Sequence, residues 1–260
     1  LEFRRVLFRS APALLLRSLS VADRWACRAL DCRALGGFWS EAQWEAELDG
    51  ASRAGLGLWS AEAADAERVL TLRSSSEPGR WRTDRVPYLR EPMDLLSPRE
   101  KRIRRVVLLF ASQTAKTEAG LNWLGRSITL DPAPFLVMFP TESFAKRQIQ
   151  QRLKPLFNDT PAVKARQISS KSRDAANAMF LKEFEGDMLL SIIGGNSGSA
   201  AQGMPAQNLW ADEVSSLPLE MDDKGDPLEN AEARQTNFPD RKTLITSTPG
   251  TRGACRITWE

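Results

Sequence analysis

The chain contains no histidine and little cysteine. With no His among 260 residues, Ser-His-Asp and Cys-His nucleophilic mechanisms and His-ligated zinc sites are excluded. Any catalysis must use carboxylates, Lys, Arg, hydroxyls or a metal held by oxygen, a set that suits phosphoryl transfer. Three cysteines, an odd number, argue for a reducing compartment without a disulfide framework. Cys27 and Cys32 have no partner pair at metal-ligand spacing.

Long apolar runs are also missing. No run could span a bilayer, and Leu14, Leu15 and Leu16 make too short a core for a signal peptide, so we expect no membrane partner. The hydrophobic content of 42% and charged content of 27% are ordinary for a soluble globular protein. The net charge of +3 is weak support for a nucleic-acid partner.

Lysine is absent from the first hundred residues. All nine lysines lie at or beyond Lys101, whereas five of the eight tryptophans fall in the first 81 residues. This shift in composition indicates a boundary near residues 85–100. Residues 7–10 resemble a translated sequencing adapter, so we expect residues 1–10 to be non-native. We expect residues 11–73 to form a poorly defined, mainly helical segment whose authenticity the composition does not establish.

The remaining chain alternates apolar runs with helical patterns. Strands are expected at residues 106–110, 135–139, 188–193, 208–211 and 243–246, and helices at 87–96, 117–126 and 141–153. Continuous apolar strands between helices are typical of a parallel sheet covered on both faces. The sequence therefore predicts an α/β fold.

Residues 106–120 have the layout of a phosphate-binding loop. An apolar strand runs into a small-residue turn that ends in Lys116 and Thr117, but Phe110 and Ala115 replace both glycines of G-x-x-x-x-G-K-[ST]. Lys116 would neutralise the β and γ phosphates, and the Thr117 hydroxyl would bind Mg²⁺. A positive φ at Ala115 would cost about 1 kcal/mol or more. The plainer alternative is a solvated Lys-Thr pair at a helix start.

Two later strands also end in polar residues. Asp212 and Glu213 resemble a Walker B element, in which Asp212 holds Mg²⁺ and Glu213 orients or deprotonates the attacking water; the alternative is an ordinary loop start. The hydroxyls of Thr246, Ser247 and Thr248 could sense the γ phosphate, or form an ordinary strand exit. Ligands bind beyond the carboxyl ends of parallel strands, and all three elements lie at such ends. Their joint occurrence by chance is much less frequent than that of any one alone.

Residues 74–260 resemble the ATPase region of GpA-type phage terminase large subunits. The motifs that carry the resemblance lie at residues 76–83, 87–91, 112–118, 211–214, 225–227, 231–234 and 246–249. It implies an ASCE, RecA-like P-loop NTPase that hydrolyses ATP with Mg²⁺ to package double-stranded viral DNA into a procapsid. It further implies a terminase small subunit and a portal protein as partners, a homo-oligomer, and the host cytoplasm.

The resemblance also implies roles for single residues. Lys116 and Glu213 would be catalytic, Thr117 and Asp212 would hold Mg²⁺, and residues 140–142 resemble a helicase-like motif near DNA. Tyr88 with Arg90 resembles the adenine-contacting segment, although core packing is the alternative for Tyr88. The expected nucleotide-binding residues are Ser112, Gln113, Thr114, Ala115, Lys116, Thr117, Tyr88 and Arg90, and the expected coupling residues are Thr246, Ser247 and Thr248.

The chain departs from the family pattern in places. The family usually has glycine at Ala115, and neither the loop nor residues 201–205 contain an arginine. A charge-stabilising arginine would come from Arg234, Arg252 or a neighbouring subunit. We expect the C-terminal nuclease domain of the family to be missing. Two alternatives stay open: a helicase-type nucleic-acid translocase, and a non-hydrolysing DNA-binding or assembly module with a decayed loop.

Overall fold

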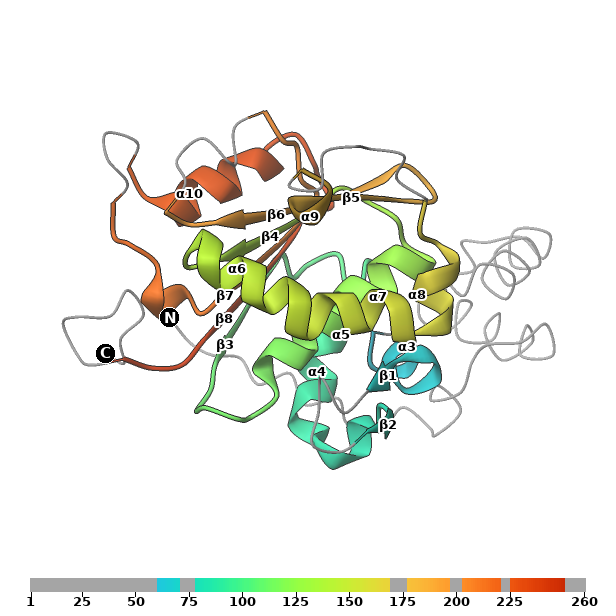
Figure 1. The fold of residues 1–260 in the computed structure, drawn as a ribbon. Coiled ribbons are helices and arrows are strands. Elements are labelled where there is room, and N and C mark those ends of the chain that lie inside the picture. Colours follow the sequence, from blue (N-terminus) through green and yellow to red (C-terminus); the bar gives the residue numbers. More distant parts are fainter. Residues whose placement is uncertain (1–59, 71–77, 169–176, 197–202, 221–224, 251–260) are drawn as a thin grey trace, which may run out of the picture. The chain divides into compact units, whose positions relative to one another are not determined.

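The computed structural model describes residues 60–70, 78–168, 177–196, 203–220 and 225–250 (Figure 1). These residues belong to one compact unit. The expectations for residues 1–10, for most of residues 11–73, for Cys27 and Cys32 and for Arg252 lie outside the described residues. No helix in the described ranges has the length and apolar character needed to cross a membrane.

A six-stranded sheet with the order β3-β8-β7-β4-β6-β5 forms the centre of the unit. Five strands run parallel, and only the edge strand β5 pairs antiparallel, with β6. The strands are β3 Arg105–Leu109, β4 Phe135–Phe139, β5 Leu181–Phe184, β6 Met188–Gly194, β7 Asn208–Asp212 and β8 Lys242–Ser247. Every residue of β4, β7 and β8 is buried. The predicted α/β fold with a mostly parallel sheet is confirmed.

One face of the sheet packs against helix α5, Lys116–Leu130. The contact is close because Gly120 faces the indole ring of Trp210 on β7. A Cβ atom at Gly120 would lie 2.2 Å from Cε2 of that ring. The helix continues past the predicted end at residue 126 and stops before Asp131, which precedes Pro132 and so disfavours helical backbone.

The opposite face packs against α10, Pro227–Glu232, and the 3-10 helices η6, Val214–Ser216, and η7, Ala233–Gln235. Its buried side chains alternate with those of the first face along β4 and β7. Asp226 caps α10 by accepting a hydrogen bond from the Leu228 N–H at 2.7 Å, and Pro227 takes the first helical position. Both faces are therefore covered by helices, as the sequence predicts.

A continuous helical segment follows β4. It comprises α6 Glu142–Gln148, a π-helix η5 at Ile149–Leu153, α7 Lys154–Asp159 and, after Thr160, α8 Pro161–Ala165. Thr141 caps α6 because its Oγ1 accepts a hydrogen bond from the Phe144 N–H at 3.2 Å. The predicted helix at 141–153 is thus present, but its second half has the wider π turn.

The N-terminal elements lie beside α5, which contacts α3 and α4 directly. They are α3 Ser60–Glu67, β1 Val69–Leu70, β2 Gly79–Arg80, η3 Thr83–Arg85, η4 Pro87–Leu89 and α4 Arg90–Leu95, and the short α9 Asn177–Phe180 lies before β5. Ala61 and Ala64 of α3 join the main core. The unit thus includes residues 60–70, which precede the boundary expected at residue 74.

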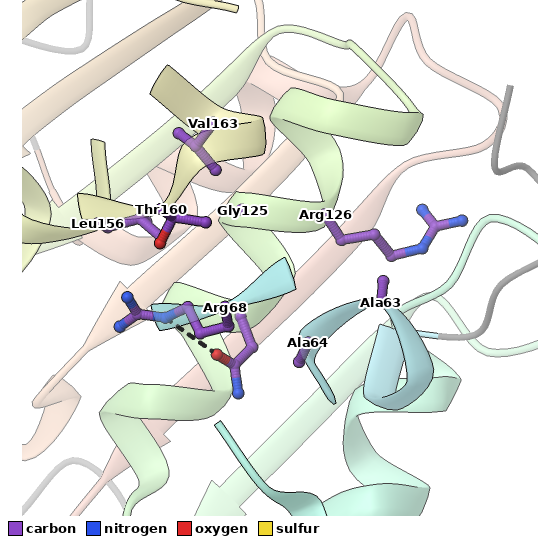
Figure 2. Close-up of a pocket in the computed structure, with 9 residues that line it drawn as sticks. Ala63, Ala64, Arg68, Gly125, Arg126, Leu156, Thr160 and Val163 are labelled. Carbon is purple, nitrogen blue, oxygen red and sulfur yellow. Dashed lines mark hydrogen bonds between the residues drawn. The ribbon is translucent and has the colours of Figure 1, made fainter. Parts of the chain in front are cut away.

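Buried Arg68 links α3 to α5. Its Nε donates to Asn122 Oδ1 at 3.2 Å, and Figure 2 shows the side chain beside Ala64 and Thr160. Burial lowers the pKa of the Arg68 guanidinium, while the neighbouring Glu118 carboxylate raises it. The adjoining cavity has a volume of about 10 Å³, enough for about one water molecule, so it is not a ligand site.

Lys242 fixes the segment that leads into β3. Its buried ammonium donates to the Leu95 carbonyl at 2.9 Å and also to the carbonyls of Glu100 and Ile103. Burial lowers the pKa of Lys242 to about 8. This contact holds residues 95–103 against β8, which pairs with β3, and so helps to position the loop that follows β3.

Candidate functional site

Three loops meet at one edge of the sheet. Strands β3, β8 and β7 are neighbours and parallel, so their carboxyl ends point the same way. Three segments are therefore adjacent: the loop at residues 110–115, the pair Asp212 and Glu213, and the hydroxyl run Thr246, Ser247 and Thr248 at the end of β8. The edge beyond the carboxyl ends of parallel strands is where α/β proteins bind ligands.

The loop after β3 turns through two left-handed residues. Gln113 has φ 62° and Ala115 has φ 58°, a region in which glycine is favoured and an L-residue costs about 1–2 kcal/mol. Ala115 is the N-cap of α5, and its carbonyl accepts from the N–H groups of Glu118 and Ala119 at 3.0 and 3.3 Å. The Thr114 hydroxyl closes the turn by donating to the Ala111 carbonyl at 2.7 Å. The positive φ expected at Ala115 is present.

Lys116 is buried and joins all three loops. Its side chain is 7% exposed, and its Nζ lies 3.2 Å from Glu213 Oε1. The same ammonium donates to Thr248 Oγ1 at 2.7 Å. The interpretation of a solvated Lys-Thr pair is therefore wrong.

Asp212 is the most buried carboxylate of the site, with 1% of the residue exposed. Its Oδ2 accepts from Thr117 Oγ1 at 3.2 Å, and its Oδ1 accepts from Thr246 Oγ1 at 2.6 Å. Burial raises its pKa to about 6, and the negative charge of Glu213 adds to this, whereas the two hydroxyl donors and Lys116 act in the opposite direction. A carboxylate this desolvated gains from a nearby cation.

Thr117 and Asp212 suit a magnesium ion. The described residues contain no group of three or more His, Cys, Asp or Glu side chains placed to hold a metal. Mg²⁺ does not need such a group, because it takes one or two protein oxygens and completes its shell with phosphates and waters. The Thr117 hydroxyl and the Asp212 carboxylate supply that pair of oxygens at 3.2 Å from each other.

Each hydroxyl after Ile245 binds a different partner. Thr246 binds Asp212 and accepts from the indole N–H of Trp210 at 3.0 Å. The Ser247 Oγ accepts from the Ser215 N–H at 2.9 Å and also contacts the Ser215 hydroxyl. Thr248 binds Lys116. The run therefore connects Asp212, the helix η6 and Lys116.

A cavity of about 590 Å³ opens beside these residues, within the size range of small-molecule sites. The loop residues Ser112 through Glu118 and Glu213 form one part of its lining. Leu70, Trp81, Gln148 and Arg152 form the rest. Leu70, Gln148, Arg152 and the Ser215 contact were not predicted from the sequence, since each depends on packing between distant segments.

Residues 75–260 match the family described as phage terminase large subunit gpA, ATPase domain. The chain belongs to this terminase family. Over 227 residues it is 26% identical to the terminase large subunit of Enterobacteria phage P21, covering 84% of this chain and 34% of that protein. Over 198 residues it is 24% identical to that of Escherichia phage lambda, covering 75% and 30%. The chain thus spans about a third of the length of these curated relatives.

The fold of the terminase ATPase domain also recurs among solved structures. The HK97 bacteriophage large terminase superposes with a TM-score of 0.56 at 13% identity, over 73% of this chain and 38% of that one. The predicted family and the predicted P-loop NTPase class are confirmed by these matches.

Tyr88 and Arg90, the two residues expected to contact the adenine, do not line the cavity of about 590 Å³. Tyr88 is 50% exposed, so the core-packing alternative is wrong. Its hydroxyl donates to the Thr114 carbonyl at 3.2 Å, and its ring meets Phe110 edge-on at 5.9 Å. Arg90 lies 3.9 Å from Asp65. Neither is among the described lining residues, and Tyr88 supports the loop from outside.

Arg234 lies near the edge of the sheet opposite Lys116, Asp212 and Thr248. Its carbonyl accepts from the Ala206 N–H at 3.2 Å, just before the amino end of β7 at Asn208. The site is at the carboxyl end of that strand, a whole strand length away. The helicase-like motif at residues 140–142 follows β4, where the Glu142 N–H donates to Asn196 Oδ1 at 3.1 Å.

Proposed function

We propose that this terminase domain binds ATP with Mg²⁺ and hydrolyses it. The proposal rests on two contacts beside one cavity of about 590 Å³. Lys116 pairs with Glu213, and the Thr117 hydroxyl donates to Asp212. Lys116 and Asp212 are both buried, which makes their interactions with a charged ligand stronger than at an exposed site.

The residues divide the work by position. The backbone of Ser112, Gln113, Thr114 and Ala115 would surround the phosphates at the start of α5, where helix N–H groups favour anions. Lys116 would leave Glu213 and bind the β and γ phosphates. Thr117 and Asp212 would hold Mg²⁺, which when bound supplies positive charge to the phosphate oxygens.

Glu213 would then be the base. Once Lys116 turns to the phosphates, the Glu213 carboxylate can accept a proton from a water molecule. The water oxygen forms a bond to the γ phosphorus, and the bond between that phosphorus and the bridging oxygen of ADP breaks. The products are ADP and inorganic phosphate.

The hydroxyl run at the end of β8 would couple hydrolysis to movement. Thr246 contacts Asp212, and Thr248 contacts Lys116. Asp212 and Lys116 would change partners when the γ phosphate leaves, and the two threonine contacts would change with them. Ser247 binds Ser215 of η6 on the other face of the sheet. A shift of β8 would therefore move η6.

The process that ATP hydrolysis would drive is inferred from membership of the terminase family. We propose that hydrolysis drives double-stranded viral DNA into a procapsid in the host cytoplasm. The partners would be the terminase small subunit, the portal protein and further copies of this chain.

The test is Glu213→Gln. Loss of the base should lower ATP turnover by about 10²–10⁴-fold, while the Kd for MgATP should change by less than about threefold, since the amide keeps the size of the side chain. Glu185→Gln is the control, because Glu185 is exposed and pairs with Arg166 far from the loop. Undiminished turnover would remove Glu213 from the mechanism.

A further inference from the structure

The nucleotide cavity has a second cation without a role in the mechanism above. Among the described residues that line it, Lys116 and Arg152 are cationic and Glu118 and Glu213 are anionic. Lys116 pairs with Glu213 at 3.2 Å, and Arg152 Nη1 pairs with Glu118 Oε1 at 2.6 Å. The first pair is part of the proposed hydrolysis centre, and the second is not.

Glu118 lies between two arginines. Its Oε2 is 3.0 Å from Arg68 Nη2, and the Arg68 side chain is only 2% exposed. Arg152 is the accessible member of the triad, with 36% of its side chain exposed. Arginine stays protonated in proteins, so these three groups carry a net charge of +1, and the carboxylate of Asp159 also acts on Arg68. The triad thus places positive charge on the cavity wall.

Arg152 belongs to the π-helix η5, and single π turns occur frequently at functional sites. Gln148, four residues earlier, lines the same cavity. Its Oε1 is buried and has no hydrogen-bond partner among the described residues. A buried acceptor without a donor is unfavourable, so this second observation indicates that a hydrogen-bond donor of a ligand, such as a hydroxyl or amino group of the nucleoside, contacts this wall.

The position of Arg152 relative to the hydrolysis centre follows from α5. Residues two apart on a helix do not face each other, so Glu118 and Lys116 line different parts of the cavity. Glu118 instead contacts Arg68, which is two residues before the lining residue Leu70. Arg152 therefore lies on the side of the cavity away from the bond that is broken.

We propose that Arg152 binds the α-phosphate of the nucleotide, exchanging the Glu118 carboxylate for a phosphate oxygen. This inference rests on the proposed ATPase function and adds a residue that retains the nucleotide. ATP and ADP share the α-phosphate. Arg152 consequently holds substrate and product alike and has little influence on the rate of the chemical step.

The experiment measures the Kd of MgATP and of MgADP by calorimetry, and kcat and KM for ATP, in the unmodified chain and in Arg152→Ala. A charged hydrogen bond of this kind is worth about 10–100-fold in affinity. We expect both Kd values and KM to rise by that factor, with kcat within about twofold. Arg152→Lys should lose part of the affinity, because lysine keeps the charge but not the planar fork.

Two further variants separate binding from folding. Arg147→Ala removes an exposed arginine of α6 that stacks over Phe144 at 4.9 Å, outside the cavity lining, and should leave both Kd values unchanged. Glu118→Gln removes the competing carboxylate and should keep or improve the affinity of the folded protein. An ion pair with a purely structural role would instead make Glu118→Gln lose affinity together with Arg152→Ala.

The outcomes are distinguishable. Unchanged Kd values in Arg152→Ala overturn the inference while leaving the proposed function intact. A loss for ATP alone, with a fall in kcat, also overturns it, because the arginine would then act on the terminal phosphate. If the unmodified chain binds neither nucleotide, the proposed function fails, and this inference fails with it.

Discussion

Ala115 holds a strained backbone at the start of the phosphate loop helix. Its φ of 58° places Cβ against the following carbonyl, at a cost of about 1–2 kcal/mol. Glycine removes that strain but makes the unfolded chain more flexible, which takes back about 0.4–1 kcal/mol. We therefore expect Ala115→Gly to raise the free energy of unfolding by about 0.5–1 kcal/mol, measured by urea denaturation.

The same substitution four residues later is the control. Ala119 is fully buried inside α5, where glycine loses helix propensity of about 1 kcal/mol as well as packing. Ala119→Gly should therefore lower the free energy of unfolding. Equal losses in both variants would contradict the strain at Ala115.

The residues of the site differ in how far the sequence could predict them. Asp212 and Thr246 stand at the carboxyl ends of apolar strands, and Lys116 follows the loop after β3. The local pattern and the rule for parallel sheets therefore place them together. Arg152 and Gln148 had no such signal in the sequence. Arg152 belongs to the π-helix η5 and Gln148 to the end of α6, and their position at the cavity depends on packing between distant segments. Tyr88 was placed at the adenine by resemblance, yet its contacts are with the loop backbone.

Helix α5 begins with Lys116 and Thr117 and contacts β7 closely at Gly120. A Cβ atom on Gly120 would come within 2.2 Å of the Trp210 ring, which is itself buried and bonded to Thr246. Overpacking of this kind costs about 1–3 kcal/mol. We expect Gly120→Ala to lower the free energy of unfolding by that amount and to lower ATP turnover, because displacement of α5 also moves Lys116 and Thr117.

Gly125 on the same helix is the matched control. A Cβ atom there would lie 3.4 Å from Leu156 Cδ1, the mobile end of a side chain. Gly125→Ala should therefore be neutral or gain up to about 1 kcal/mol of helix propensity. Thermal melts of both variants measure the change in stability. Similar losses of stability in the two variants would contradict the close contact at Gly120.

The elements that the sequence predicted are those with a strong pattern. β4 was predicted with its observed bounds, since all five residues are buried and apolar. β5 was missed because its Leu-Lys-Glu-Phe sequence is short, half-exposed and polar at its centre, as suits an antiparallel edge strand. Residues 60–70 gave no pattern of their own and are ordered through contacts with α5, such as that of Arg68.

For the whole molecule, burial of Asp212 opposes folding in the absence of a cation. Its pKa is about 6 in the folded protein against an ordinary value of 3.8, so the folded state binds more protons than the unfolded state between these pH values. The free energy of unfolding that proton binding to Asp212 contributes is fully present below pH 3.8, and it is lost as the pH rises through 6. Above that window the loss corresponds to about 3 kcal/mol.

We therefore expect Asp212→Asn to stabilise the nucleotide-free protein above pH 6, by up to about 3 kcal/mol, because the amide does not ionise. The difference in unfolding free energy between the variant and the unmodified protein should shrink as the pH is lowered. Asp240→Asn, at an exposed carboxylate paired with Lys101, should show no such trend. A difference that does not vary with pH would contradict the raised pKa of Asp212.

The same carboxylate should make the ligand-bound protein the more stable one. At a MgATP concentration 100 times the Kd, binding to the folded state alone adds about 2.7 kcal/mol, which offsets most of the loss from burying Asp212. The melting temperature of the unmodified chain should therefore rise with MgATP. In Asp212→Asn the part of that rise that requires Mg²⁺ should vanish, because the amide oxygen carries no charge to hold the ion, while ATP without Mg²⁺ should still bind through Lys116. Equal Mg²⁺-dependent rises in both proteins would place the ion elsewhere.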